Sequence, residues 1–181
     1  VIDNGSNSDS IWAVKAANRN AIVVELGENL GFTGGNNAGL KYALDHGADY
    51  IILLNNDTIV APDMFDSRID TMEKDPSIGI VGPMIYYYDS PDMIWSAGGR
   101  INWENGNTSM VGLNETDRGQ FGETPQPTDF VTGCALLARR AVWEQIGGLD
   151  ENFFMYYEET EWCVRAARAG SGSPRTDGSS H

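Results

Sequence analysis

Apolar and polar positions alternate along the first 82 residues in a pattern that predicts strands and helices in turn. Runs of β-branched or fully apolar residues predict strands, and apolar residues spaced over helical turns predict helices. The predicted strands span 21–26, 50–54 and 78–81, and the predicted helices span 8–18, 36–46 and 62–74. Strands that alternate with helices in this way favour a three-layer α/β fold with a largely parallel sheet.

The pattern changes after Pro83. Short aromatic and β-branched pieces, separated by Gly, Asn, Asp and Pro, predict antiparallel hairpins as far as about residue 111. A loop is expected over 114–128. The remaining predicted elements are a strand over 130–138 and helices over 140–146 and 158–169.

Both ends of the chain depart from this pattern. The chain opens with Val1-Ile2-Asp3, which resembles the end of a strand running into a turn, so we expect the start of the domain to lie upstream. Residues 171–181 contain no large apolar side chain. Such a segment cannot bury enough surface to offset its ordering entropy, so we expect it to be a disordered tail.

Composition argues against several classes of protein. The formal net charge of −14 disfavours sequence-independent binding to nucleic-acid phosphates and docking on an anionic lipid surface. No apolar run approaches the ~20 residues that a transmembrane helix needs. Cys134 and Cys163 are too few and too far apart to indicate a zinc site or a disulfide framework, so we expect both to be reduced.

The strand predicted over 50–54 ends in Asn55, Asn56 and Asp57. An apolar strand of this kind is typical of a sheet covered on both faces, and ligands bind such sheets at the carboxyl ends of the strands. Amide and carboxylate oxygens at that position suit a divalent cation held together with the phosphates of a substrate. A turn that caps the next segment is an equally good interpretation of the three residues.

Four glycines lie between residues 27 and 35, where a loop is expected to join a strand to a helix. Glycine lets a backbone approach a ligand closely, and the helix start beyond the loop would offer unpaired N–H groups to an anion. The spacing matches neither the dinucleotide-binding fingerprint nor the Walker loop. The glycines therefore indicate either contact with a phosphate or sugar, or ordinary turn residues.

Asp3, like Asp57, is a carboxylate just beyond a strand end. Two strands that deliver acids to one rim favour a shared site, in which Asp3 would hydrogen-bond a ribose hydroxyl or a base imide. The alternative role for Asp3 is an Asx turn with Gly5.

Three glutamates, Glu158, Glu159 and Glu161, cluster at the start of the last predicted helix, after the aromatic run 153–157. Acids in a first helical turn are stabilised by the helix dipole, and Glu161 with Arg165 has the spacing of a surface ion pair. A carboxylate that aromatic residues bury in part would instead have a pKa raised towards the range of a general base.

Taken in order, these segments closely resemble the inverting family-2 glycosyltransferases, and within them the bacterial rhamnosyltransferase-type enzymes. The matching segments are 1–6, 29–32, 35–37, 54–57, 132–135, 147–154 and 158–159, so the resemblance covers roughly residues 1–170. It implies one domain of the GT-A fold over 1–170, with a nucleotide-binding half over 1–82 and an acceptor half over 83–170. It also implies a first strand upstream of Val1.

The resemblance implies a nucleotide-sugar site that uses Mg²⁺ or Mn²⁺. Asp3 falls where the family contacts the nucleoside base. Asp57 occupies the last position of the family's D-x-D motif and is the implied metal ligand. The remaining residues implied to contact the nucleotide-sugar are Asn29, Gly31, Gly35, Asn36, Asn55 and Asn56.

Glu158 and Glu159 fall on the family's Glu-Asp pair, whose second acid is usually taken as the catalytic base. The second acid is a glutamate in this chain, and its extra methylene changes the reach of the base. Either glutamate is therefore a candidate for removing the proton of the acceptor hydroxyl.

The implied partners are a dTDP- or UDP-linked sugar and a saccharide or lipid-linked acceptor, as in cell-wall or polysaccharide synthesis, with no nucleic acid. The implied location is the cytoplasm, with peripheral association at the inner face of the plasma membrane as a further option. Because both ends depart from the family, we expect a fragment that turns over poorly. A nucleotide-sugar-binding module without turnover is the alternative, and the glycine spacing disfavours a nicotinamide oxidoreductase.

Overall fold

The computed structural model describes residues 1–6, 8–122, 124–172 and 174–177. They form two compact units. Unit 1 comprises Val1–Ala48 and Gly148–Glu158, and unit 2 comprises Asp49–Gly147 and the described residues from Glu159 onward. These units do not coincide with the expected halves 1–82 and 83–170, because the segment 148–158 returns to the first 48 residues.

Unit 1 contains two short parallel strands and two helices. The strands pair through Ile2 with Val24 and through Asp3 with Glu25. The elements are β1 (Ile2–Asp3), α1 (Ser8–Ala17), β2 (Val24–Glu25) and α2 (Gly31–Asp45). The expected strand over 21–26 is thus only two residues long, whereas α1 matches its prediction closely.

The helix α2 begins at Gly31, so the prediction of a loop as far as residue 35 is wrong. The side chain of Asn4 explains this early start. Its Oδ1 accepts the N–H of Leu30 at 2.9 Å, and its Nδ2 donates to the carbonyl of Gly31 at 2.8 Å. A residue 27 positions upstream therefore supplies the polar contacts at the helix start, and no local pattern around residues 27–37 reveals that partner.

Two glycines bring α2 close to β1. A Cβ atom added at Gly39 would lie 2.8 Å from Cγ1 of Ile2, and one added at Gly35 would lie 3.1 Å from Nδ2 of Asn4. Both distances are shorter than ordinary carbon contacts, so the helix can approach the strand this closely only where a side chain is absent. These glycines serve helix–strand packing within unit 1.

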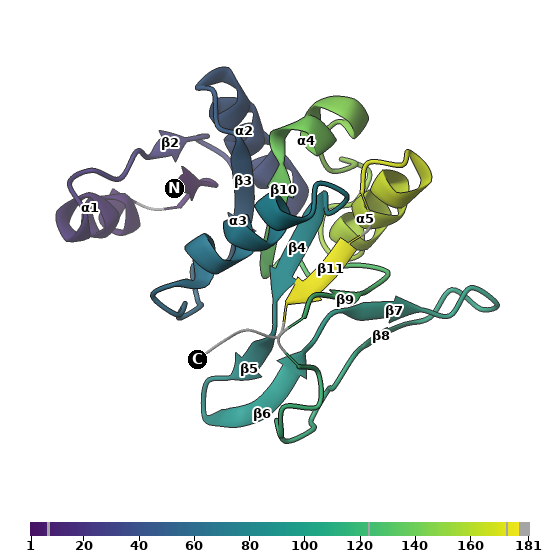
Figure 1. The fold of residues 1–181 in the computed structure, drawn as a ribbon. Helices are drawn as coiled ribbons and strands as arrows, with labels where there is room; N and C mark the ends of the chain where they lie inside the picture. Colours follow the sequence, from purple (N-terminus) through teal and green to yellow (C-terminus); the bar gives the residue numbers. More distant parts are fainter. Residues whose placement is uncertain (7, 123, 173, 178–181) are drawn as a thin grey trace. The chain divides into compact units, whose positions relative to one another are not determined.

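Unit 2 contains the main sheet, whose five strands lie in the order β3-β10-β4-β11-β9 (Figure 1). The strand β10 runs antiparallel to both β3 and β4, whereas β4 and β11 are parallel. The α/β class is confirmed, but the sheet is mixed because β10 inserts between two strands of the opposite direction. The strands are β3 (Tyr50–Leu54), β4 (Ile80–Pro83), β9 (Gln126–Pro127), β10 (Ala135–Arg139) and β11 (Pro174–Asp177).

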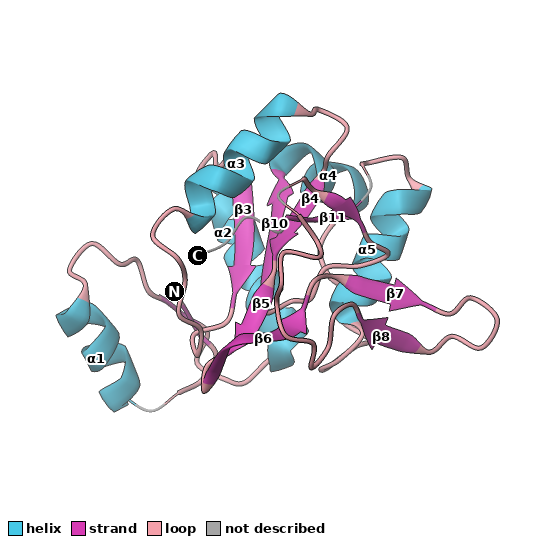
Figure 2. Cartoon of the chain, turned by 60° about the horizontal axis from the view of Figure 1, so that its bottom comes forward, coloured by secondary structure: helices cyan, strands magenta, loops and turns pink. Residues whose placement is uncertain are grey.

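Helices cover both faces of this sheet. Figures 1 and 2 show α3 on one face and α5 on the other. Beneath α3 lies a buried cluster of Met72, Ile78, Val81 and Leu137. On the other side, Trp143 and Trp162 stack with ring centroids 3.9 Å apart and join α4 to α5. The helices are α3 (Met64–Lys74), α4 (Arg140–Ile146) and α5 (Glu158–Arg168), of which Glu158 belongs to unit 1.

The prediction of disorder over 171–181 is wrong for residues 174–177, which form β11. Asp177 is buried, and its carboxylate lies 3.1 Å from the guanidinium of Arg68 on α3. The hydroxyl of Thr71 donates to the same carboxylate at 3.0 Å. This strand carries no large apolar side chain. Pairing with β4 and the buried ion pair therefore provide the free energy that orders it. Residues 173 and 178–181 lie outside the described residues.

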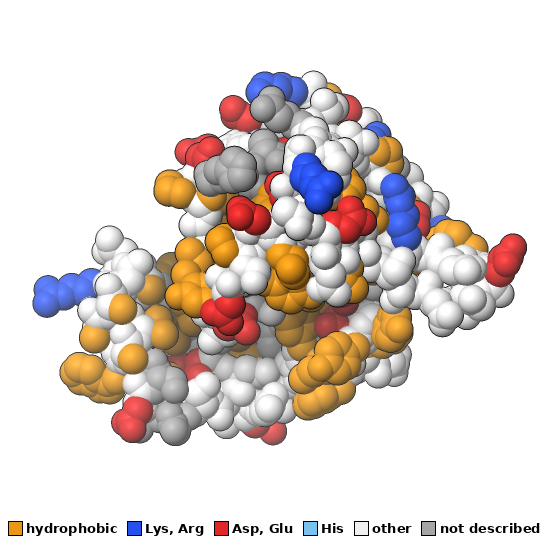
Figure 3. All heavy atoms as spheres, turned by 90° about the horizontal axis from the view of Figure 1, so that it is seen from below, with side chains coloured by type: hydrophobic (Ala, Val, Ile, Leu, Met, Phe, Trp, Pro, Cys, Tyr) orange, Lys and Arg blue, Asp and Glu red, His pale blue; other side chains and the backbone are white. Residues whose placement is uncertain are grey.

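Two hairpins extend unit 2 beyond the main sheet, as predicted from the pattern after Pro83. Their strands are β5 (Ile85–Tyr87), β6 (Ser90–Ser96), β7 (Gly99–Ile101) and β8 (Thr108–Met110). Apolar side chains reach the surface at several places on the face shown in Figure 3. Within the described ranges, no helix combines the length and the apolar character that crossing a membrane requires.

Candidate active site

The segment Asn55–Asp57 follows β3 directly and begins opposite the start of β10. The N–H of Asn55 donates to the carbonyl of Cys134 at 3.0 Å, which continues the pairing of β3 with β10 by one residue. The hydroxyl of Thr58 then closes a turn by donating to the carbonyl of Asn55 at 2.7 Å. Asn56 and Asp57 are exposed on this turn. The segment is therefore a turn that leaves the carboxylate of Asp57 accessible to a ligand.

The pKa of the Cys134 thiol indicates that Asp57 lies nearby. Burial raises the pKa of the Cys134 thiol, and the negative charge of Asp57 raises it further. The carboxylate of Asp57 is therefore near enough to Cys134 for its charge to act on the thiol. Cys134 and Cys163 are both free, as predicted.

Glu159 approaches the same 132–134 turn from α5. Burial raises the pKa of its carboxyl group, and hydrogen bonds from the backbone N–H groups of Glu159, Thr160 and Gly133 offset part of the rise. One turn further along α5, Cys163 is fully buried, and its thiol accepts a hydrogen bond from the N–H of Val131. Burial raises the pKa of that thiol to about 12. Two successive turns of α5 thus pack against the segment 131–133.

The 132–134 turn consequently joins two candidate site residues of unit 2. Its Cys134 carbonyl holds the segment that carries Asp57, and its Gly133 N–H holds the carboxylate of Glu159. The segment that bears the accessible carboxylate of Asp57 and the half-buried carboxylate of Glu159 therefore both approach this turn. A metal ligand and a general base call for these two environments, respectively.

This edge suits a divalent cation only if a substrate completes the site. Among the described residues there is no group of three or more His, Cys, Asp or Glu side chains that could enclose a metal. Mg²⁺ is often bound by one or two carboxylates together with substrate phosphates, and its other positions are filled by water. Asp57, with the amide oxygen of Asn55 nearby in the chain, fits that shared kind of site.

In unit 1, Asp3 takes the turn role that the sequence left open. It is 8% exposed at the end of β1, and its Oδ1 accepts the N–H of Ser6 at 3.2 Å. Gly5 lies inside this turn, where its φ of +80° and its contact with Glu28 both exclude a side chain. Contact of Asp3 with a base, and its convergence with Asp57 of unit 2, stay predictions.

The start of α2 does not offer the open N–H groups that the sequence suggested. The amide of Leu30 donates to Asn4, that of Gly31 donates to Oδ1 of Asn29 at 2.9 Å, and that of Phe32 donates to the carbonyl of Phe154 at 3.1 Å. These three donors have protein acceptors, so an anion at this helix start would have to displace them. Asn29 therefore organises the backbone here, and any nucleotide contact of Asn29 or Gly31 stays a prediction.

Gly35 and Asn36 lie inside α2 rather than in a loop. Gly35 packs against Asn4 as described above, and the amide of Asn36 donates to the carbonyl of Phe32 one turn earlier at 2.8 Å. Asn36 is partly exposed, so its Oδ1 remains a candidate ligand acceptor. The nucleotide-binding roles of both residues stay predictions.

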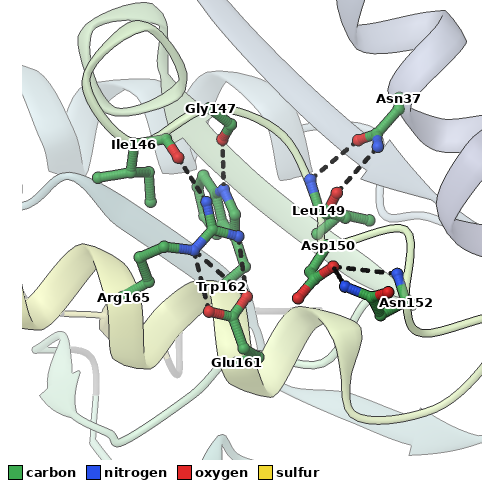
Figure 4. A network of polar contacts seen from close by, with 9 residues as sticks. All are labelled: Asn37, Ile146, Gly147, Leu149, Asp150, Asn152, Glu161, Trp162 and Arg165. Carbon is green, nitrogen blue, oxygen red and sulfur yellow. Dashed lines mark hydrogen bonds and ion pairs between the residues drawn. The ribbon is translucent and has the colours of Figure 1, made fainter.

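Asn37, which was not assigned a role, holds the segment 148–158 to α2. Its side-chain amide donates to the carbonyl of Leu149 at 2.9 Å, and its Oδ1 accepts the N–H of Leu149 at 2.9 Å (Figure 4). A side chain at Gly148 would collide with Asn37, because an added Cβ would lie 2.4 Å from Oδ1. Asp150 then accepts the N–H of Asn152 at 3.0 Å and closes the next turn.

Further along this segment, Tyr156 and Tyr157 have φ angles of +74° and +68°. Left-handed backbone is uncommon for bulky residues and costs roughly 1–2 kcal/mol per residue. Strain of this kind persists only where neighbouring structure imposes it, and it concentrates at functional sites. The two tyrosines immediately precede Glu158, which is 4% exposed at the start of α5.

Within unit 2, polar contacts lock α5 to the end of α4. The indole N–H of Trp162 donates to the carbonyl of Gly147 at 2.8 Å, and Arg165 donates to the carbonyl of Ile146 (Figure 4). Arg165 also forms the predicted pair with Glu161, with Nη2 and Oε2 2.8 Å apart. Glu161 thereby has a structural partner. Glu158 and Glu159 stay the candidate bases, and Glu159 is the one that approaches the 132–134 turn.

Sequence patterns gave no signal for the roles of Asn4, Asn37 and Gly133. Asn4 and Asn37 act through partners 26 and 112 residues away. Gly133 acts through its backbone N–H, which every residue except proline possesses. The only local signal for these three roles is that each residue is a glycine or asparagine within a segment that matches the family.

The comparison that decides the family is the match of the sequence profile of glycosyl transferase family 2 to residues 1–146. The chain belongs to this family. The profile spans all of the segment Asn55–Asp57 and the 132–134 turn, and it ends before Glu158.

Named relatives of this family member are glycosyltransferases. It is 31% identical over 171 residues to the low-salt glycan biosynthesis hexosyltransferase Agl10 of Haloferax volcanii, covering 93% of this chain and 52% of that protein. It is 25% identical over 173 residues to the dTDP-rhamnosyl transferase RfbF of Shigella flexneri, covering 94% of this chain and 54% of that protein. The chain thus spans about half the length of the curated relatives it matches.

Solved structures confirm the GT-A fold. The crystal structure of GalNAc-T7 with UDP, GalNAc and Mn²⁺ superposes with a TM-score of 0.72 at 16% identity, covering 97% of this chain and 35% of that one. At this identity the likeness establishes the fold alone.

Proposed function

We propose that this family-2 protein is an inverting glycosyltransferase that moves a sugar from a nucleotide-diphosphate donor to a saccharide or lipid-linked acceptor. The observation that carries the proposal is the 132–134 turn, which contacts both the segment bearing Asp57 and the carboxylate of Glu159. This arrangement supports leaving-group stabilisation and proton removal at one edge of the sheet.

Asp57, with Asn55, would hold Mg²⁺ or Mn²⁺, and the bound cation would supply stabilisation of the negative charge on the departing diphosphate. Glu159 would accept the proton of the acceptor hydroxyl. The acceptor oxygen then forms a bond to the anomeric carbon while the bond from that carbon to the donor phosphate oxygen breaks. A single displacement from the opposite face inverts the anomeric configuration.

The raised pKa of Glu159 supports its role as the base. A base is most effective when its pKa lies near the working pH, because it is then both deprotonated and sufficiently basic. Glu159 is partly exposed, so an acceptor can reach it, whereas Glu158 is 4% exposed.

The donor class follows from the names of the relatives, which point to hexose or 6-deoxyhexose transfer. Sugar nucleotides of this kind are cytosolic metabolites, so we place the reaction in the cytoplasm, with a lipid-linked acceptor reached at the inner membrane surface. The first donors to test are dTDP-rhamnose and UDP-hexoses.

The test is Mn²⁺-dependent sugar transfer by the wild-type chain and by Asp57→Asn, with Asp66→Asn as a control at an exposed acid on α3. We expect Asp57→Asn to lose the metal-dependent turnover and Asp66→Asn to retain it. Equal turnover by all three proteins would refute the metal assignment. Binding of UDP or dTDP with Mn²⁺ by calorimetry, without any transfer, would instead favour a binding module.

A further inference from the structure

The segment 148–158 of unit 1 is held at three places. Asn37 holds Leu149 through two hydrogen bonds, and Phe32 donates its N–H to the carbonyl of Phe154. The ring of Phe154 also covers Gly31, where an added Cβ would lie 2.7 Å from the ring. The third place is the start of α5, where Glu158 is buried. Only Met155, Tyr156 and Tyr157 lie between the last two of these places.

These three side chains are exposed, and the backbone is strained at the two tyrosines. Met155, Tyr156 and Tyr157 are 51%, 73% and 53% exposed. Neither phenol forms a hydrogen bond within the described residues. Burial therefore does not account for two consecutive tyrosines in the left-handed region, and strain of this kind is concentrated at functional sites.

Exposed tyrosines have the chemistry that recognises carbohydrate. An aromatic ring offers a flat apolar face to the C–H groups of a pyranose, and the phenol can donate to or accept from a sugar hydroxyl. Tyrosine also loses little conformational entropy on binding, because it has only two side-chain torsions. A backbone that is already fixed at both ends lowers that entropy further.

The chain itself limits how far these rings lie from the candidate base. Tyr157 and Glu159 are two residues apart, so their Cα atoms are within about 7 Å of each other. The two residues are therefore close along the chain, at the point where α5 begins. The exposed acidic neighbour Glu151 disfavours an anionic ligand and favours a neutral one.

We propose that Tyr156 and Tyr157 form the platform on which a neutral acceptor saccharide stacks. This inference rests on the proposed glycosyl transfer, since it places the acceptor rather than the donor at these rings. The strained backbone presents the two rings towards solvent next to the start of α5. The platform is a binding feature, and the proton transfer remains with Glu159.

The experiment measures saccharide binding without turnover. Saturation-transfer NMR with methyl α-L-rhamnoside, methyl β-D-glucoside and methyl β-D-galactoside gives a Kd for the wild-type chain. We expect Tyr156→Ala and Tyr157→Ala each to raise the Kd for saccharide about tenfold, because each variant loses one stacked ring. The Phe variants should stay within about threefold because they keep the stacking face. Tyr88→Ala, at an 81% exposed tyrosine of the β5–β6 hairpin, is the matched control and should not change the Kd.

A second set of variants separates binding from folding. Glycine adopts positive φ without strain, so Tyr156→Gly and Tyr157→Gly should not lower Tm although they weaken saccharide binding. The affinity for UDP or dTDP with Mn²⁺ should be unchanged in every Tyr variant. A purely structural role for the tyrosines predicts the opposite result, a lower Tm with an unchanged Kd for saccharide.

The outcomes also distinguish this inference from the proposed function. Saccharide binding that is weakened in the Ala variants, in a protein that never transfers sugar, supports the platform and refutes the transferase. Transfer with an unchanged acceptor KM in the Ala variants refutes the platform alone. The absence of any saturation transfer to the wild-type chain also overturns the platform. A wild-type dimer in size-exclusion chromatography that becomes a monomer in the Ala variants would overturn the platform as well, because the rings would then contact a second copy of the chain.

Discussion

The backbone N–H of Gly133 lies close enough to the carboxylate of Glu159 to offset part of the rise that burial causes in its pKa. This contact joins a turn at the start of β10 to the first turn of α5. The adjacent Cys134 carbonyl accepts the N–H of Asn55, so the same turn also contacts the segment after β3. Backbone groups of this turn thus contact both the candidate base and the segment that carries the candidate metal ligand.

The pH dependence of transfer should report the pKa of Glu159. Because burial raises this pKa above the ordinary glutamate value, the base becomes protonated at a higher pH than an exposed glutamate would. We expect kcat/KM to fall as the pH drops through this raised pKa. Glu159→Gln should lower kcat roughly 10²–10⁴-fold, which is the usual contribution of a positioned base. The control Glu104→Gln, on the exposed β7–β8 loop, should keep wild-type kcat, and a Glu159→Gln enzyme of full activity would exclude this base.

The same residue should lower the stability of the folded chain. A carboxyl group whose pKa is raised by folding favours the folded state only in its protonated form. Its contribution is therefore fully present below the unfolded pKa and is lost as the pH rises through the folded pKa. We expect Glu159→Gln to raise Tm at pH 7 and to give no gain at pH 3.5, where both states of the wild type are largely protonated. A Tm difference that is constant over this pH range would contradict the raised pKa.

Packing of α2 on β1 predicts an unusual effect of alanine at a helical glycine. Gly→Ala inside a helix normally stabilises by about 1 kcal/mol. At Gly39 the added methyl would meet Ile2 at 2.8 Å, so we expect Gly39→Ala to destabilise by roughly 1–3 kcal/mol in urea unfolding. In an Ile2→Ala background the same substitution should stabilise instead. Destabilisation of equal size in both backgrounds would argue against this contact.

The buried pair of Asp177 and Arg68 should be essential to the edge of the main sheet. Removing one partner of a buried ion pair typically costs about 3–5 kcal/mol, because the other charge stays buried without compensation. We therefore expect Asp177→Ala to lower the free energy of unfolding by this amount. Asp89→Ala, at an exposed hairpin residue, should have little effect. An unchanged urea midpoint for Asp177→Ala would mean that residues 174–177 are disordered, as their composition suggested.

Local patterns predicted the elements whose ends depend on nearby residues. The strand Tyr50–Leu54 and the helices Arg140–Ile146 and Glu158–Arg168 appear where periodicity placed them. The Glu161–Arg165 pair also forms, since i,i+4 spacing brings the two side chains together in any helix. The sequence likewise identified the segment 55–57 and Glu159 as candidates through resemblance to the family.

Partners far apart in the chain decided the rest. Asn4 caps the start of α2 from 26 residues away, Asp177 is ordered by Arg68 across 109 residues, and β10 enters the sheet between β3 and β4. The sequence by itself determined the residue types and the local conformations they prefer. Only the tertiary structure decided which donors and acceptors are already paired, because hydrogen bonds and burial depend on neighbours that sequence separation does not reveal.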